Sequence, residues 1–346
     1  MSNYNHKENL LELEDKALIY TGYDYTDNDP YGLAEQYFQF CQQNLSEEQG
    51  EYEIQPARFM IRDAATVNAL ATKRYNYYVV GVNMGTLTGL HQFFVHRGGI
   101  FDAPAMAEYV ALEGKMDVTL DILLYQTATQ FTYYHELAHL IQYSPLPGAA
   151  CADGALPDVQ ETQEAYVVGA GKEDPYDLEK HLKEFDADLY GGRFICLHLL
   201  EYWKKLEEED RTPANLERLL SLGTASVFTY FIFLLGKYPE MYYDASDHPH
   251  PLIRILYIID MFIKTAQENM PARVQVQSET ILQRAFTITQ PMFTFGGGED
   301  QVKKYADLFG VEKENIEAYV NGVLIPGSRQ MPCLVLERVA AKHGIV

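Results

Sequence analysis

Apolar residues recur at helical spacing along most of the second half of the chain. Residues 120–134 carry Leu, Phe and Tyr side chains three or four positions apart, and residues 140–143 continue the pattern until Ser144-Pro145 ends it. The same spacing predicts helices elsewhere, at residues 10–17, 32–44, 84–95, 175–204, 252–266 and 314–320. The chain is therefore predicted to be mostly helical.

A short region with the spacing of strands lies among the early helices. Residues 53–62 are one candidate strand, and residues 76–84 are a second, in which aromatic and β-branched residues alternate. Side chains alternate between the two faces of a strand, so we expect the second strand to turn one face to the core and the other to a cleft. A small sheet in a mostly helical chain predicts an α+β fold.

The chain is predicted to have three regions. Residues 1–55 form an acidic helical N-terminal segment, residues 56–270 form the core with the candidate chemistry, and residues 271–346 form a helical C-terminal extension. Glycines mark residues 148–171 as a loop that either covers a cleft or only connects two helices. Gly296-Gly297-Gly298 lacks the Lys-Ser/Thr of a phosphate loop, so we interpret it as a turn before a helix at Gln301.

Residues 219–236 form the longest uncharged run. Its eighteen residues are at the lower limit for a membrane span. The run is interrupted by small and hydroxyl residues, namely Ser221, Gly223, Thr224, Ser226 and Thr229. We therefore expect a buried core helix, with a membrane-touching helix as the alternative.

The charge of the chain is strongly negative. There are 49 acidic and 27 basic residues, a formal net charge of −22. Affinity for phosphate backbones comes chiefly from Lys and Arg, so neither nucleic acid nor an anionic membrane surface is expected as a partner. Residues 1–55 contain twelve acids against Lys7 and Lys16, a net charge of −10. This segment is either a solvated face or an acidic docking surface for a basic substrate.

The cysteines and the first residues bear on the compartment. Residues 1–15 have no apolar core of the kind found in secretion signals. The four cysteines are Cys41, Cys151, Cys196 and Cys333. They form no Cys-x-x-Cys pair. We expect a reduced, cytoplasmic protein.

The segment His135-Glu136-Leu137-Ala138-His139 lies inside the helix predicted from residue 120. Two histidines four positions apart leave the same helix face, about 40° apart in projection, so both can reach one metal ion. Glu136 projects beside them and can take a proton from a metal-bound water. The alternative is a buried helix with three polar side chains and no metal, which is costly in free energy.

A catalytic zinc ion usually takes three protein ligands and one water, so a third ligand is needed. Glu184 and Asp188 are four residues apart on one predicted helix face, which suits a ligand followed by a carboxylate that orients a histidine. Asp186 is expected to point elsewhere, and His181 and Asp188 are rival ligands. We expect one zinc ion per chain, held by His135, His139 and Glu184.

Four short motifs, in this order, resemble those of gluzincin metallopeptidases. They are Asn68-Ala69-Leu70-Ala71 with the strand after it, His135 to His139, Glu184-Phe185-Asp186-Ala187-Asp188, and His248-Pro249 with Arg254 six residues after His248. The pattern is similar to that of the CAAX prenyl endopeptidase and the bacterial heat-shock membrane protease, over about residues 65–260. Soluble phage-exclusion peptidases and the regulator-cleaving peptidases that are paired with phage-type repressors are at least as near, because the chain lacks clear spanning helices.

The resemblance implies a zincin-like fold with an edge strand, ahead of the zinc-binding helix, along which substrate lies. It implies that Glu184 binds zinc, that Asp188 supports the site by orienting His135, and that His248 and Arg254 lie nearby. His248 is a candidate donor to the oxyanion of the tetrahedral intermediate. His250 and Arg254 are accessory candidates, and His250 is as well explained as a helix cap. Tyr133, Tyr134 and Tyr190 are further candidate donors near the zinc.

These features together predict a zinc metalloendopeptidase that hydrolyses a protein or peptide substrate, with Glu136 as the base. One alternative is a zinc-binding regulatory, toxin-antitoxin or phage-defence component with little turnover. Another is a non-catalytic scaffold derived from a peptidase. The intact Glu136 argues against the scaffold, because loss of that base is the usual way in which such sites become inert.

Overall fold

A small sheet and a large set of helices make up the part of the chain that the computed structural model describes. That part consists of residues 4–15, 22–26, 29, 31–74, 76–95, 100–144, 177–235, 240–244, 248–270, 276–294, 300–331 and 335. The strands are β1 (Ala57–Arg62), β2 (Ala69–Arg74) and β3 (Tyr77–Asn83). The α-helices are α1 (His6–Asp15), α2 (Leu33–Glu48), α3 (Met84–Phe94), α4 (Ala107–Glu113), α5 (Leu120–Gln142), α6 (Leu178–Lys205), α7 (Pro213–Leu235), α8 (Pro251–Asn269), α9 (Ser278–Thr294), α10 (Gln301–Tyr319) and α11 (Ile325–Ser328). Short helical segments are η1 (Ile100–Asp102), η2 (Pro104–Met106), η3 (Glu208–Asp210) and η4 (Val320–Leu324), the last of which is a π-helix.

The sheet has three strands in the order β1-β3-β2. β1 runs parallel to β3, and β2 runs antiparallel to it, with Ala69 opposite Val82. β1 and β2 are thus the edge strands, and both precede α5 in the chain. The resemblance implied that the strand after Asn68-Ala69-Leu70-Ala71 lies at the edge. The strand predicted at residues 76–84, which is β3, is central and almost entirely buried, so the expectation that one of its faces borders a cleft was wrong. The reason is that helices cover both faces of the sheet, α1 on one face and α2 and α5 on the other.

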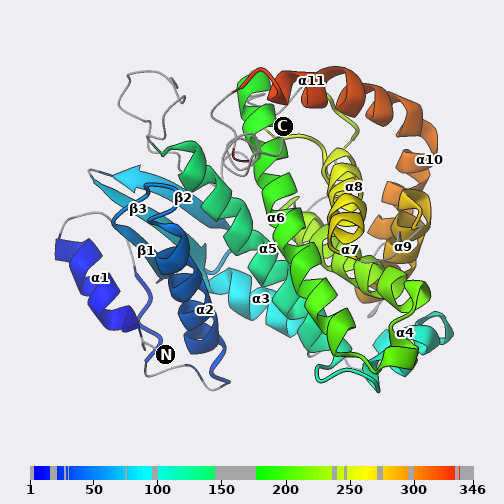
Figure 1. Cartoon of the computed structure of the whole chain (residues 1–346), viewed down its shortest axis with the longest axis horizontal. Helices are drawn as coiled ribbons and strands as arrows, with labels where there is room; N and C mark the ends of the chain where they lie inside the picture. Colours follow the sequence, from blue (N-terminus) through cyan, green and yellow to red (C-terminus); the bar gives the residue numbers. More distant parts are fainter. Residues whose placement is uncertain are drawn as a thin grey trace.

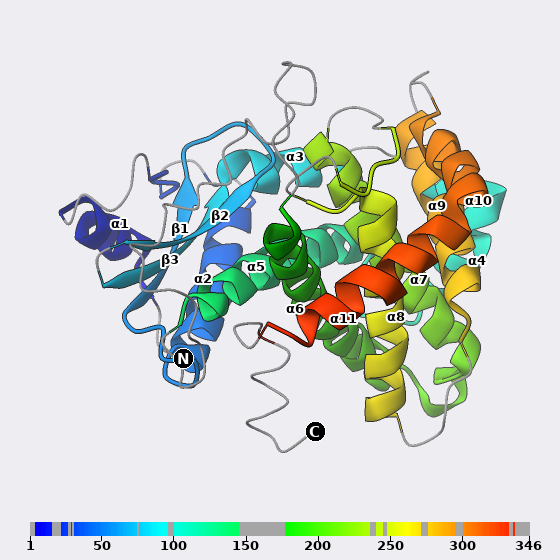
Figure 2. The ribbon, with the colours of Figure 1, turned by 90° about the horizontal axis from the view of Figure 1, so that it is seen from above.

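Helices cover both faces of the sheet. On one face, Met60 and Val79 pack against Leu10 and Leu13 of α1. On the other face, α2 and α5 lie against the strands, and α6 to α10 are on the far side of α5 from the sheet (Figures 1 and 2). One continuous apolar core includes residues of all three predicted regions. α5 therefore lies between the sheet and the remaining helices.

The boundaries of the long helices have local causes. α6 begins at Leu178 because the side chain of Asp177 accepts hydrogen bonds from the backbone N–H groups of the first turn. α8 begins after His250 with Pro251 at its first position. α10 begins at Gln301, as the interpretation of the three glycines predicted, although it is longer than the predicted helix. The three glycines and the loop at residues 148–171 lie outside the described residues.

The uncharged run at residues 219–236 lies almost entirely within α7, and the described side chains of the run are mostly buried in the core. Gly223 allows α7 to approach α6 closely, since an added Cβ atom there would lie 2.5 Å from Leu199 Cδ1. The prediction of a buried core helix is confirmed. Within the described ranges, no helix is both long and apolar enough to cross a membrane.

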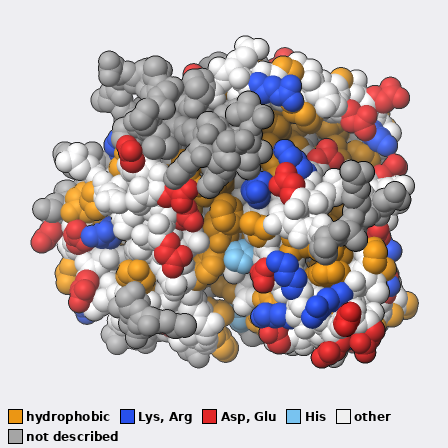
Figure 3. Space-filling model, in the orientation of Figure 1, with side chains coloured by type: hydrophobic (Ala, Val, Ile, Leu, Met, Phe, Trp, Pro, Cys, Tyr) orange, Lys and Arg blue, Asp and Glu red, His pale blue; other side chains and the backbone are white. Residues whose placement is uncertain are grey.

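The surface in Figure 3 shows acidic side chains scattered over the face rather than gathered in one patch. A hollow with apolar side chains separates the half that carries the sheet from the helical half. Some acids of the N-terminal segment have basic partners, as in Glu12 with Arg58 (2.8 Å) and Asp24 with Lys7 (3.5 Å). These ion pairs neutralise part of the negative charge of this segment.

His6, the first residue of α1, generates a prediction about pH. Its ring is buried against Tyr25 and Phe38, with ring centroids 4.4 and 4.8 Å away, and its Nε2 atom accepts a hydrogen bond from the Ile61 N–H. Burial lowers the pKa of His6 to about 4. The unfolded chain takes up this proton near pH 6.5 and the folded chain only near pH 4. The free energy of unfolding should therefore fall between these values as pH falls, by at most about 3 kcal/mol.

We expect His6→Phe, which cannot be protonated, to lose this part of the pH dependence. Urea denaturation of both proteins at about pH 7.5 and about pH 4.5 measures the effect. Equal losses of stability in the two proteins on acidification would contradict the assignment.

Candidate metal centre

Two helices bring the predicted metal ligands together. α5 carries His135 and His139, α6 carries Glu184, and the two helices lie side by side (Figures 1 and 2). Gly191 permits this approach, because an added Cβ atom would lie 3.1 Å from the Phe131 ring and 3.5 Å from the backbone nitrogen of His135. A larger residue at position 191 would push α6 away from the first histidine.

The three candidate ligands form one compact group. The Nε2 atoms of His135 and His139 are 3.1 Å apart. Glu184 Oε2 lies 3.3 Å from His135 Nε2, and Glu184 Oε1 lies 3.2 Å from His139 Nε2. In a tetrahedral zinc site with bonds of about 2.0–2.1 Å, neighbouring ligand atoms are about 3.3 Å apart. The observed separations fit one ion.

Asp188 fixes the orientation of His135 through the Nδ1 atom of the ring. His135 Nδ1 lies 2.9 Å from Asp188 Oδ1. Arg254 donates two hydrogen bonds of 2.7 Å to the Asp188 carboxylate, and the Tyr257 hydroxyl donates a third of 2.6 Å. Burial alone would raise the pKa of Asp188, but Arg254 outweighs it and the pKa is lowered. Because the ionised carboxylate can only accept, Nδ1 of His135 carries a proton, and Nε2 is the ring nitrogen that faces the other candidate ligands.

The orientation of His139 is fixed in the same way by Gln142. The Gln142 Nε2 group donates to the Lys183 carbonyl at 3.0 Å and to Asp186 Oδ2 at 2.9 Å. Both of these partners can only accept, so the amide oxygen of Gln142 is the atom that lies 2.9 Å from His139 Nδ1. Nδ1 of His139 therefore donates to Gln142, and its Nε2 atom also faces the other candidate ligands.

Two imidazole Nε2 atoms and a carboxylate thus face one another in a buried space. The Oε2 atom of Glu184 accepts no hydrogen bond from the described part of the chain. Burial alone would lower the pKa values of His135 and His139. Asp188 and Glu184 outweigh burial at His135, and Glu184 outweighs it at His139, so both pKa values are raised. Burial raises the pKa of Glu184, yet His248 and His139 hold it well below its usual range. The group favours a cation, and one metal ion satisfies all three ligand atoms at once.

Other predicted residues lie around this group. Glu136 is buried on the same turn of α5, and its charge helps to raise the pKa of His139. His248 Nε2 lies 3.5 Å from Glu184 Oε1, and Arg254 Nη2 lies 3.7 Å from Glu184 Oε2. Both side chains are buried. His248 and Arg254 therefore contact the third ligand, as the resemblance implied.

Several candidates are placed elsewhere. The Nδ1 atom of His181 lies 2.8 Å from the Tyr319 hydroxyl, and His181 is not in the group that could hold a metal. His250 caps α8, since its Nδ1 atom accepts a hydrogen bond from the Leu252 N–H at 3.2 Å. The three tyrosines predicted near the zinc are not in contact with its ligands in any described interaction. Tyr133 donates to Asn44, Tyr134 pairs with His198, and Tyr190 packs against Phe194.

Three residues that hold the site together were not predicted from the sequence. They are Gln142, Tyr257 and Asp186, the last of which points away from the metal group but binds Gln142. Two of them have a sequence signal. Gln142 lies three residues after His139, and Tyr257 lies three residues after Arg254, so each shares a helix face with a predicted residue.

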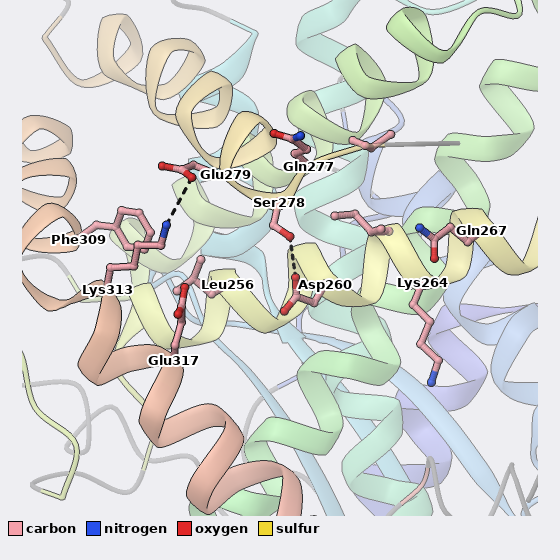
Figure 4. Close-up of a pocket in the computed structure, with 12 residues that line it drawn as sticks. Leu256, Asp260, Lys264, Gln267, Gln277, Ser278, Glu279, Phe309, Lys313 and Glu317 are labelled. Carbon is pink, nitrogen blue, oxygen red and sulfur yellow. Dashed lines mark hydrogen bonds and ion pairs between the residues drawn. The ribbon is translucent and has the colours of Figure 1, made fainter. Parts of the chain in front are cut away.

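A groove of about 540 Å³ lies between α8, α9 and α10 and contains none of the predicted site residues (Figure 4). Some of its polar groups pair with one another. Lys313 lies 3.4 Å from Glu279, and Ser278 donates to Asp260 at 2.9 Å. The groove has no His or Cys in its lining and is not a second candidate for zinc.

No protein-family model matches the sequence, and neither a curated protein nor a solved structure is significantly similar to it.

The geometry generates a prediction about metal content. Because two imidazoles and a carboxylate suit zinc, protein purified without chelators and supplied with zinc should carry about one zinc ion per chain. Glu184→Ala should weaken zinc binding strongly, whereas Glu179→Ala, an exposed change on the same helix, should not. Elemental analysis of the three proteins provides the measurement. Absence of zinc from the wild-type protein would overturn the site.

Proposed function

We propose that the chain is a zinc metalloendopeptidase that hydrolyses peptide bonds of a protein or peptide substrate. The observation that carries this proposal is the buried group of His135, His139 and Glu184, with Glu136 on the same turn of α5. A zinc ion held by these three ligands supplies a Lewis acid, which polarises a carbonyl and lowers the pKa of water. Protein side chains supply the remaining chemistry.

Glu136 is proposed as the general base and acid. Its carboxylate accepts a proton from the attacking water and then gives it to the amine that leaves. A base is not needed to hold a structural zinc ion, and a buried carboxylate next to two histidines is otherwise costly. Its presence therefore favours hydrolysis over a purely structural zinc site.

His248 is proposed to stabilise the negative charge that forms on the carbonyl oxygen when water adds to it. An imidazole N–H can donate to this oxygen, and its position beside Glu184 puts it next to the ligand group. Arg254 is committed to the carboxylate of Asp188 by two short hydrogen bonds. Its role in this proposal is to hold Asp188, and through it His135.

An extended substrate is proposed to lie along β2. This strand pairs with β3 on one side and is at the edge of the sheet, so its other side can pair with an added strand. β2 and β3 both pack against α5, the helix that carries Glu136. This arrangement is similar to the one that the gluzincin resemblance implies.

The proposal predicts a separation between the base and the ligands. Glu136→Gln should keep its zinc but lose hydrolysis by at least about a hundredfold, because an amide cannot accept the proton. Zinc content and cleavage of a fluorogenic peptide library, measured on the same preparations, test this. If Glu136→Gln lost zinc as completely as Glu184→Ala, Glu136 would be a ligand and not the base.

A second prediction concerns the two histidines before α8. His248→Ala should lower kcat by about a hundredfold with little change in KM or zinc content, because its contact forms only in the transition state. His250→Ala is the matched comparison, and we expect it to affect thermal stability through loss of a helix cap. Equal effects of the two changes on kcat would exclude His248 as the specific oxyanion donor.

A further inference from the structure

We propose that the C-terminal extension positions a zinc ligand, by means of a hydrogen bond from the backbone of Val335 to Asp186. The inference rests on the proposed zinc site. Asp186 is 2% exposed, and its Oδ2 atom accepts two hydrogen bonds, from Gln142 Nε2 at 2.9 Å and from the Val335 N–H at 2.7 Å. Val335 is fully buried and lies 149 residues after Asp186.

These bonds form a continuous chain from the extension to the metal group. Val335 donates to Asp186, Gln142 also donates to Asp186, and the oxygen of the same Gln142 amide accepts from His139 Nδ1. The direction of each bond follows from the chemistry, because a carboxylate can only accept and a backbone N–H can only donate. Asp186 thus fixes the orientation of His139 through Gln142, whereas Asp188 fixes the orientation of His135 directly.

The extension contacts the same turn of α6 in two other places. Tyr319, the last residue of α10, lies with its hydroxyl 2.8 Å from His181 Nδ1. Gly327 of α11 packs so closely that an added Cβ atom would lie 2.9 Å from Leu182 Cδ2. α11 lies against the first turns of α6 (Figures 1 and 2). All three contacts fall on residues 181–186, the turn that carries Glu184.

The expected consequence is a dependence of metal affinity on the extension. A buried carboxylate that loses a donor is less well compensated, so its position and that of the Gln142 amide become less fixed. His139 then loses the partner that holds its ring and its tautomer. Changes to residues that orient metal ligands in this way typically weaken metal binding by about ten- to hundredfold.

The test uses the full-length chain. Val335→Pro removes the backbone donor, because proline has no N–H, and its ring also fixes φ at this residue. Val335→Ala is the matched control, since it shortens the side chain and keeps the donor. Asp186→Asn replaces the acceptor, and Asp260→Asn on α8 is a control change of the same type outside the site. Zinc affinity is measured by competition with a chromophoric chelator, and the geometry is followed by the visible absorption of the Co²⁺-substituted protein.

We expect Val335→Pro and Asp186→Asn each to weaken zinc binding by about ten- to hundredfold and to alter the Co²⁺ spectrum. The two controls should do neither. Val335→Pro should add little to Asp186→Asn in the double variant, because both act through one carboxylate. Urea denaturation of the zinc-free proteins separates this effect from a general loss of stability. If Val335→Pro does not fold, the zinc affinity and the Co²⁺ spectrum of Asp186→Asn test the inference.

Wild-type zinc affinity and an unchanged Co²⁺ spectrum in Asp186→Asn would overturn the inference and leave the proposed function intact. Additive losses in the double variant would also overturn it, since the two residues would then act independently. A wild-type protein that binds no zinc would instead refute the proposed function.

Discussion

Two imidazole Nε2 atoms and a carboxylate lie 3.1–3.3 Å from one another inside this protein. Each histidine uses its Nδ1–H to donate backwards, to Asp188 or to Gln142, so both Nε2 atoms face the same space. The buried carboxylate of Glu184 favours positive charge in this space, which a metal ion can supply. The close packing of α5 and α6 at Gly191, and the burial of every ligand, follow from the need to hold these atoms about 3 Å apart.

The residues that hold the ligands come from the whole helical half of the protein. Arg254 and Tyr257 bring α8 to Asp188, and the Arg254 guanidinium lies over the Phe231 ring of α7 at 4.3 Å. Val335 brings the C-terminal extension to Asp186. Helices that supply no candidate metal ligand are therefore still connected to the site. A buried histidine needs a hydrogen-bond partner in a fixed position, and that partner must itself be held by further hydrogen bonds.

The parts of the site that could be predicted are those set by local spacing. His135, His139, Glu184 and Asp188 each lie four residues from a partner on one helix, and helix geometry brings such pairs together. The Gln142–Asp186–Val335 connection depends on packing between distant segments, which no local pattern encodes. The central position of β3 was missed for the same reason, since strand order depends on which segments pair and not on the alternation within one strand.

The position of α5 links the two halves of the molecule. Its motif face meets α6, and Tyr134 also pairs with His198 of α6, while Tyr133 donates a hydrogen bond to Asn44 of α2. The same helix packs against the edge strand β2. A single rigid element thus fixes the distance between Glu136 and any peptide that pairs with β2. The base role that we propose for Glu136 requires it to lie within hydrogen-bonding reach of the proton that it takes, and a buried helix is better suited to this than a loop.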